Sequence, residues 1–192
     1  MGAAFVWRTP SGWTGRRYHL GMNKEVFDAE VFAIYQALRY LDLLQENGRR
    51  YTLFADSTAA IEQVRTNACG PGQRFATAAM EACDHILSRD NQVTIRWAPA
   101  HIKVEGNEKA DAYAKAAAAR TAPCCDKETP TELRDEASLS YMIRTATEAR
   151  SRASEEWIKG NVRAEWRYRP PPGKGLRRKH LRYVRKELAG RL

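Results

Sequence analysis

The amino-acid sequence predicts an α/β domain followed by a helical, basic extension. Over residues 1–118, short apolar runs alternate with amphipathic patterns, which is typical of a sheet flanked by helices. Residues 119–131 are rich first in Ala and then in Pro, Cys and Thr, and they include Pro123 and Pro130. We therefore expect a linker over residues 119–131 and a separate helical segment over residues 132–192.

Each element has a local signal in the sequence. Thr9-Pro-Ser-Gly12 is turn chemistry between two apolar runs, which predicts a hairpin. Phe27, Val31 and Ile34 follow helical spacing, and Asn47-Gly48 is a helix end. We expect strands over residues 2–7, 13–20, 50–55 and 92–97, and helices over residues 24–46, 59–64, 75–87, from the N-cap Asn107 onward, 133–159 and 176–192.

The positive charge is concentrated in the extension. The chain has a formal net charge of +9, and residues 161–192 contain eleven Lys and Arg against two Glu, so the rest is balanced. An excess of one sign indicates a polyanionic partner, and we single out Arg177, Arg178 and Lys179 as nucleic-acid contacts. The alternative is that this run of charges is simply a solvated face.

Cysteine usage and hydropathy indicate the cellular compartment in which we expect the protein. The four cysteines lack metal-site spacing, and Cys124 and Cys125 are adjacent, which favours free thiols in a reducing compartment. We find neither a membrane-spanning apolar run nor a signal-peptide pattern, and we expect an intracellular protein, nuclear or cytoplasmic, with no membrane partner. Other hydrolases and phosphatases fit poorly, because there is no Gly-x-Ser-x-Gly elbow and no Gly-rich phosphate loop.

Three acids and one histidine are candidates for chemistry. Glu30 flanks the apolar stripe of the first long helix, Asp56 follows an apolar strand, and His101 precedes Asp111 at the start of a helix. Carboxylates are preferred ligands of Mg²⁺ and Mn²⁺, and two such ions about 4 Å apart can promote phosphodiester hydrolysis. An imidazole could move a proton there. The alternatives are that Glu30 is a solvated flank and that Asp56 only caps the next helix.

The motifs around these residues resemble a known family. The pieces that carry the resemblance are Asp28-Ala-Glu-Val-Phe-Ala-Ile-Tyr-Gln-Ala-Leu38, Phe54-Ala-Asp-Ser57, Trp97-Ala-Pro-Ala-His101 and Gly106-Asn-Glu-Lys-Ala-Asp-Ala-Tyr-Ala-Lys-Ala116. With them the chain resembles the type 1 ribonuclease H (RNase H) domain found at the end of non-LTR, LINE-type retrotransposon reverse transcriptases, particularly fungal ones. The resemblance spans residues 2–118.

This resemblance implies a fold, a reaction and site residues. It implies a mixed five-stranded sheet flanked by helices and cleavage of the RNA strand of an RNA–DNA hybrid with two Mg²⁺ or Mn²⁺ ions. By motif, Glu30, Asp56 and Asp111 would be metal ligands and His101 the mobile catalytic histidine. Ser57 and Asn107 would contact the hybrid, which such domains recognise through 2′-hydroxyls and phosphates. A reverse transcriptase region would lie upstream in the full-length protein.

The chain departs from the family pattern at its beginning. The family's first aspartate lies in a Thr-Asp-Gly-Ser strand in the middle of the sheet, before the strand that matches Gly2-Ala-Ala. Here no acid occurs before Glu25, so we expect that strand to be missing and its neighbours' edges to be unpaired. Residues 185–192 resemble a point at which such proteins continue, so we expect truncation at both ends.

These observations lead to a principal expectation and two alternatives. The principal expectation is an RNase H-type endonuclease domain whose activity is weakened or lost in this chain, because the first catalytic aspartate is absent. The first alternative is a non-catalytic, nucleic-acid-binding remnant of a retrotransposon polyprotein. The second is a product that does not fold stably.

Overall fold

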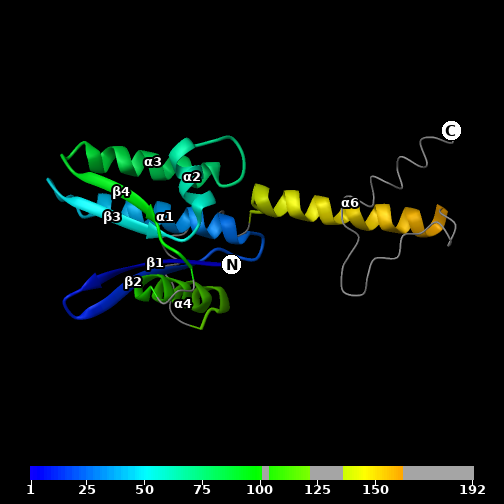
Figure 1. Ribbon diagram of the computed structural model, residues 1–192, viewed down its shortest axis with the longest axis horizontal. Helices are drawn as coiled ribbons and strands as arrows, with labels where there is room; N and C mark the ends of the chain where they lie inside the picture. The colour runs from blue at the N-terminus through cyan, green and yellow to red at the C-terminus, as the bar shows by residue number, and fades with distance from the viewer. Residues whose placement is uncertain (101–103, 122–135, 162–192) are drawn as a thin grey trace. The chain divides into compact units, whose positions relative to one another are not determined.

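The computed structural model of the protein describes residues 1–100, 104–121 and 136–161. The chain divides into two compact units, Met1–Thr145 and Ala146–Leu192. The first unit contains all the described strands and four complete helices (Figure 1). The second unit, as far as it is described, is the continuation of helix α6 (Leu139–Asn161). Within the described part of the chain, no helix is long and apolar enough to cross a bilayer.

The chain begins with an antiparallel hairpin. Strand β1 (Gly2–Thr9) pairs with β2 (Gly12–His19) across a two-residue turn. The Thr9 hydroxyl donates to the Gly12 carbonyl at 2.8 Å, and Gly12 has a φ of 125°, which favours glycine. The predicted hairpin is confirmed, with its first strand two residues longer than expected.

A parallel strand pair forms the second sheet. Strand β3 (Arg50–Ala55) lies beside β4 (Gln92–Trp97), and the crossover between them contains α2 (Thr58–Thr66) and α3 (Gln73–Leu87). Both strands have the predicted bounds. The Ser57 hydroxyl accepts a hydrogen bond from the Ala60 N–H at 3.2 Å and so caps α2, which makes Ser57 and not Asp56 the capping residue of this helix.

The two strand pairs are separate sheets. Among the described residues, β1 is paired only with β2 and β3 only with β4, so the five-stranded sheet implied by the resemblance is not formed. The α/β class is nevertheless confirmed, with one antiparallel pair, one parallel pair and flanking helices.

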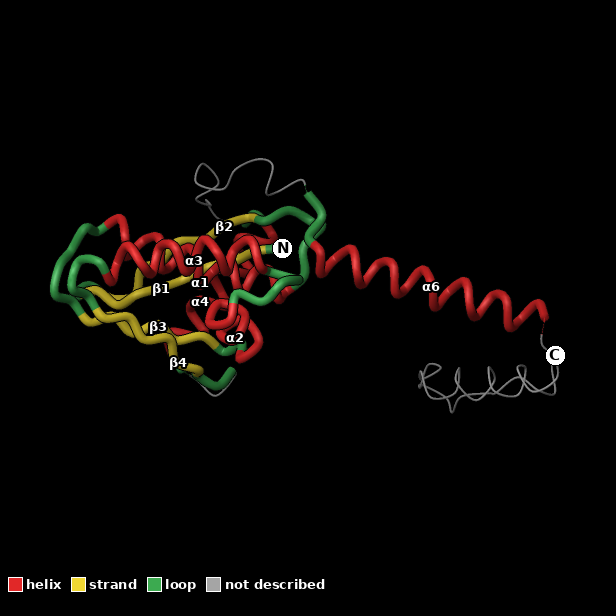
Figure 2. Tube along the Cα trace, turned by 90° about the horizontal axis from the view of Figure 1, so that it is seen from above, coloured by secondary structure: helices red, strands yellow, loops and turns green. Residues whose placement is uncertain are grey.

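The core is organised around helix α1 (Val26–Leu43). Its apolar face carries Val31, Phe32, Ile34 and Leu38, all buried. Phe32 makes edge contacts with Tyr18 of β2 and Phe75 of α3, at ring-centroid distances of 5.4 and 5.1 Å. The helix thus connects the hairpin to the α3 side of the molecule (Figure 2). It is shorter than the predicted 24–46, because Glu25 is the N-cap and Gln45 adopts a left-handed φ of 53°.

Helix α4 (Glu105–Ala119) packs against the hairpin. The contact is close, because a Cβ at Gly2 would lie 2.1 Å from the Ala114 carbonyl oxygen. The prediction that Asn107 is the N-cap is wrong. Val104 precedes the helix, so Gly106 and Asn107 lie in its first turn, and the Asn107 side chain bonds Asp56 instead of the start of its own helix.

The start of α6 is attached to the start of α1. Asp28 is 1% exposed, and its carboxylate accepts hydrogen bonds from the hydroxyls of Ser138 (2.6 Å) and Ser140 (2.7 Å). It also accepts from the Glu25 N–H at 2.8 Å, which closes the first turn of α1. The helix predicted over residues 133–159 corresponds to α6, which is described from Leu139 to Asn161. Most of the predicted linker and the whole predicted helix 176–192 lie outside the described residues.

Candidate active site

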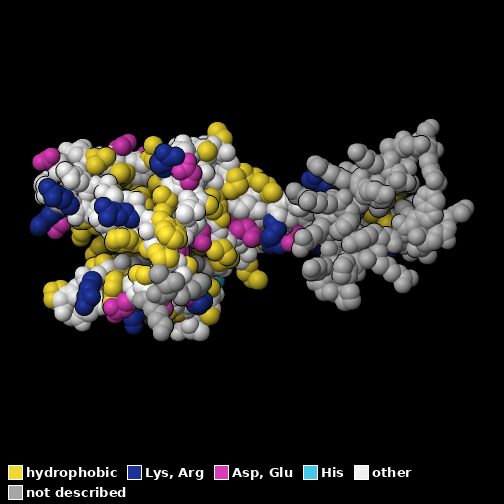
Figure 3. Space-filling model, viewed as in Figure 1, with side chains coloured by type: hydrophobic (Ala, Val, Ile, Leu, Met, Phe, Trp, Pro, Cys, Tyr) yellow, Lys and Arg dark blue, Asp and Glu magenta, His cyan; other side chains and the backbone are white. Residues whose placement is uncertain are grey.

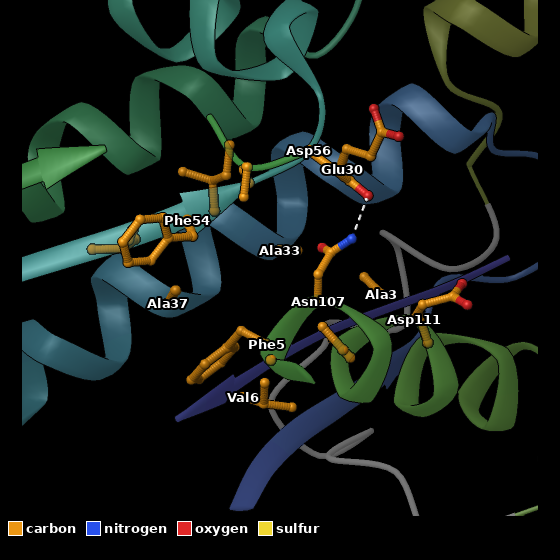
Figure 4. A pocket seen from close by; sticks show the side chains of 18 of the residues that line it. Ala3, Phe5, Val6, Glu30, Ala33, Ala37, Phe54, Asp56, Asn107 and Asp111 are labelled. Atoms are coloured by element: carbon orange, nitrogen blue, oxygen red, sulfur yellow. Dashed lines mark hydrogen bonds between the residues drawn. The ribbon is translucent and has the colours of Figure 1, made fainter. Parts of the chain in front are cut away.

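A cavity of about 1270 Å³ lies between the two sheets. Four elements wall it: β1 and β3 on two sides, and α1 and α4 on the others (Figure 4). We call it the intersheet cavity. Hydrophobic side chains gather over the middle of the face shown in Figure 3. The cavity lies within the Met1–Thr145 unit.

Most of the predicted site residues meet at this cavity. Although they come from three separate parts of the sequence, five of them line it: Glu30, Asp56, Ser57, Asn107 and Asp111. Local sequence patterns do not predict that these three parts of the chain lie close together, whereas the family resemblance does. The other four predicted site residues lie outside the described residues: His101, Arg177, Arg178 and Lys179.

Asp56 is held by groups from two other elements. Its Oδ2 accepts a hydrogen bond from Nδ2 of Asn107 on α4 at 3.0 Å (Figure 4). Its backbone carbonyl accepts from the indole N–H of Trp97, the last residue of β4, also at 3.0 Å. The carboxyl end of β3 is therefore fastened both to its neighbouring strand and to the helix across the cavity.

Glu30 lies on the first turns of α1 and is partly buried. Burial raises the pKa of the Glu30 carboxyl above its usual value. A hydrogen bond from the Ser57 side chain lowers this pKa, and the negative charge of Asp56 raises it further. The negative charge of Asp56 is therefore close enough to affect the ionisation of Glu30, and Ser57, the N-cap of α2, contributes in the opposite direction.

Asp111 has a partner on its own helix. Its Oδ2 lies 2.6 Å from Nζ of Lys115, one helical turn later, and both side chains are exposed. Such an exposed pair contributes little to stability, about 0.5 kcal/mol or less. Asp111 is therefore free to exchange Lys115 for another cation at low cost.

The donor chemistry of these residues suits a hard divalent cation. Three carboxylates and the side-chain oxygen of Asn107 are the ligand types that Mg²⁺ and Mn²⁺ prefer. Their arrangement is looser than a metal cage, because in the described ranges no three His, Cys, Asp or Glu side chains are grouped closely enough to hold an ion. The cavity thus provides suitable ligands on three walls without assembling them.

Several roles were missed by the sequence reasoning. The contact of Asn107 with Asp56 had no local signal, because it joins residues 51 positions apart. Asp28, two residues before Glu30, is the buried acid of α1 and has a structural role; its spacing from Glu25 could have indicated a helix-start contact. Trp97 also lines the cavity and is 55% exposed. His85 is exposed on α3, with its Nδ1 3.5 Å from Oδ2 of Asp42.

Comparison with known families agrees with this geometry. An α/β domain with carboxylates around one cavity is the class that the structure defines. The family model described as RNase H matches residues 3–119, which is more than half of the chain, and the chain therefore belongs to the RNase H family. Domains of this family bind RNA–DNA hybrids and generally use divalent metal ions. No curated protein matches the chain significantly.

Proposed function

We propose that residues 3–119 form an endoribonuclease domain that hydrolyses the RNA strand of RNA–DNA hybrids, with Glu30, Asp56 and Asp111 as its catalytic carboxylates. The observation that carries this proposal is that the three acids of the family motifs line one cavity although they come from three different elements. We further propose that the domain is of type 1 and belongs to a LINE-type retrotransposon protein that also contains a reverse transcriptase.

The three carboxylates would hold a divalent cation, Mg²⁺ or Mn²⁺. Such an ion, when bound, supplies a Lewis acid and an activated water for phosphodiester hydrolysis, and the intact site of the family would hold two. Glu30 and Asp56, whose charges already interact, are the natural pair of ligands, and Asp111 joins them from α4.

The remaining residues would orient the acids and the substrate. Asn107 fixes Asp56 through its amide N–H, and Ser57 hydrogen-bonds the Glu30 carboxylate, so each neutral side chain positions one acid. Both are also placed to meet the sugar and phosphates of a bound hybrid. In the proposal, His101 moves a proton near the leaving group.

The test is cleavage of a labelled RNA–DNA hybrid by the full chain in Mg²⁺ and in Mn²⁺, with matched RNA and DNA duplexes as specificity controls. We expect metal-dependent cleavage of the RNA strand of the hybrid alone. Asp56→Asn should abolish it, whereas Asp84→Asn, which changes an exposed acid on α3 away from the cavity, should not. Cleavage that is equal in the two variants would refute the assignment.

A second candidate function is nucleic-acid binding without catalysis, and the charge asymmetry favours it. Residues 161–192 carry eleven basic and two acidic side chains, Arg177, Arg178 and Lys179 among them. If this segment provides the affinity, deleting residues 162–192 should weaken hybrid binding and make its salt dependence shallower. An unchanged affinity and salt slope would rule the extension out as the binding element.

A further inference from the structure

Helix α1 begins beside the beginning of α6. Asp28, in the first turn of α1, is 1% exposed and accepts hydrogen bonds from the hydroxyls of Ser138 at 2.6 Å and Ser140 at 2.7 Å. The Ser138 N–H also donates to the Asn23 carbonyl at 2.9 Å. These contacts all lie within the Met1–Thr145 unit. The first turn of α1 and the segment that precedes it are therefore both bonded to the start of α6.

Ser138 belongs to both helix starts. Its hydroxyl oxygen accepts a hydrogen bond from the Tyr141 N–H at 3.2 Å, which caps α6, while its hydroxyl proton is donated to Asp28. Asp28 in turn accepts from the Glu25 N–H at 2.8 Å and closes the first turn of α1. One carboxylate thus lies at two helix N-termini, where a negative charge is favoured. The two helix starts therefore stabilise each other through Asp28.

Two charged side chains add to this contact. Nε of Arg144 on α6 lies 2.7 Å from Oε1 of Glu25, the N-cap of α1. The ammonium group of Lys24 donates to the backbone carbonyl of Glu136. The partners on the α6 side all follow residues 3–119, which the family model matches, so the contact joins α1 to a segment outside the family pattern.

Helix α1 connects this contact to Glu30. Asp28 and Glu30 are two residues apart and therefore about 200° apart around the helix axis. Asp28 faces α6, whereas Glu30 lines the intersheet cavity and takes a hydrogen bond from the Ser57 side chain. Because a hydrogen bond weakens steeply when its geometry changes, loosening the first turn of α1 would alter how Glu30 lies against α2.

We propose that Ser138 and Ser140 are positioning residues for Glu30, because the start of α6 holds the first turn of α1 and thereby sets where the Glu30 carboxylate lies. The segment that follows the family-matched residues 3–119 is then part of the functional domain. This inference rests on the proposed function, in which Glu30 is a metal ligand. A misplacement of about 1 Å in such a site can lower the rate about 100-fold, so a remote anchor can matter for activity.

The test uses three variants of the full chain and Mn²⁺ as the probe. Ser140→Ala removes one donor to Asp28 and leaves the cap of α6 in place, whereas Ser140→Thr keeps the hydroxyl. Ser154→Ala is the control, because the Ser154 hydroxyl bonds one turn back within α6. We expect Ser140→Ala to raise the midpoint of Mn²⁺-induced NMR broadening at Glu30 by about tenfold, and the other two variants to keep the wild-type midpoint.

A second readout needs no metal and no cleavage. The NMR signal of the Glu30 side-chain carboxyl carbon reports the surroundings of that group in the free chain, and near-UV circular dichroism shows that each variant is folded. We expect Ser140→Ala to move this signal toward that of an exposed glutamate, because Glu30 is partly buried in the wild type. Ser140→Thr should return the signal to its wild-type position.

The two readouts separate this inference from the proposed function. If Ser140→Ala lowers the melting temperature but leaves the Glu30 signal in place, the contact is structural only and the inference is overturned. It is also overturned if Ser154→Ala moves the signal as far, or if Ser140→Thr does not restore it. A wild type that neither binds Mn²⁺ nor cleaves a hybrid would refute the proposed function, while a Glu30 signal that moves in Ser140→Ala and returns in Ser140→Thr would still support the positioning role.

Discussion

Asn107 on α4 donates a hydrogen bond from Nδ2 to Oδ2 of Asp56 at 3.0 Å, so a neutral amide holds the carboxylate at the end of β3. Replacing this amide should affect the site more than the fold. We expect Asn107→Ala to lower the free energy of unfolding by about 1 kcal/mol or less, because the bond is exposed. Metal-dependent hybrid cleavage should fall by about 10- to 100-fold, as when other outer-shell partners of metal ligands are removed.

Asn161→Ala is the control for that change, because among the described residues the Asn161 side chain bonds within α6, to the Trp157 carbonyl. Denaturant unfolding and initial cleavage rates measure the two effects separately. A large loss of stability without a change in the rate per folded molecule would show that Asn107 is structural.

Asp28 should prove the more important acid of α1 for stability. Its buried carboxylate accepts hydrogen bonds from Ser138, Ser140 and the Glu25 N–H, and an amide cannot accept all of them equally. Asp28→Asn should cost about 1.5–3 kcal/mol, measured by urea unfolding, as expected for hydrogen bonds to a charged group. Asp84→Asn on α3 is exposed and should cost almost nothing; equal effects of the two substitutions would contradict the account.

Glu30 should make the stability of the domain dependent on pH. Its pKa is raised in the folded state by burial and by Asp56, so the folded state holds this proton more tightly than the unfolded state does. The stability of the wild type should therefore fall as the pH rises from 4.5, its usual value, through the raised pKa. Glu30→Gln should remove this fall and stabilise the domain at neutral pH by less than about 1 kcal/mol, because the carboxylate is partly exposed.

Thermal melts of both proteins between pH 4 and 8 test this sign. The two melting curves should converge at the acidic end and separate above it, with the variant more stable. A variant that is less stable at neutral pH would contradict the cause given for the raised pKa.

Two phenylalanines should differ in how much their truncation destabilises the domain. Phe32 is fully buried between Tyr18 and Phe75, so Phe32→Ala should cost about 3–5 kcal/mol. Phe54 is 66% exposed on β3, and Phe54→Ala should cost about 1 kcal/mol or less. Chemical denaturation measures the free energy of unfolding of each variant. Similar losses in the two variants would contradict the placement of Phe32 in the core.

The sequence predicted the local elements better than their assembly. Apolar runs and helical spacing located β3, β4 and α3 within two residues, because these signals are contained in each segment. The end of α1 and the start of α4 were less accurate, since left-handed residues such as Gln45 and the true N-cap Val104 are set by tertiary context. The separation of the two sheets follows from long-range pairing, which local periodicity does not encode.

In the candidate site, too, the sequence predicted the individual residues better than the contacts between them. Glu30, Asp56 and Asp111 were identified by family motifs, and the structure places all three at one cavity. The partners that hold them were not identified, because the Asn107–Asp56 contact depends on where two distant elements meet. The anchoring of Asp28 by Ser138 and Ser140 was missed for the same reason, since 110 and 112 residues separate the partners.

The central claim is that Glu30, Asp56 and Asp111 act as one site for a divalent cation. The most direct measurement is a Mn²⁺ titration of the full chain, following paramagnetic broadening of the backbone NMR signals of these three residues. We predict that the three signals broaden together with one midpoint, and that Asp56→Asn raises this midpoint by about tenfold or more. Broadening at unrelated Mn²⁺ concentrations, or a midpoint unchanged by Asp56→Asn, would contradict the account.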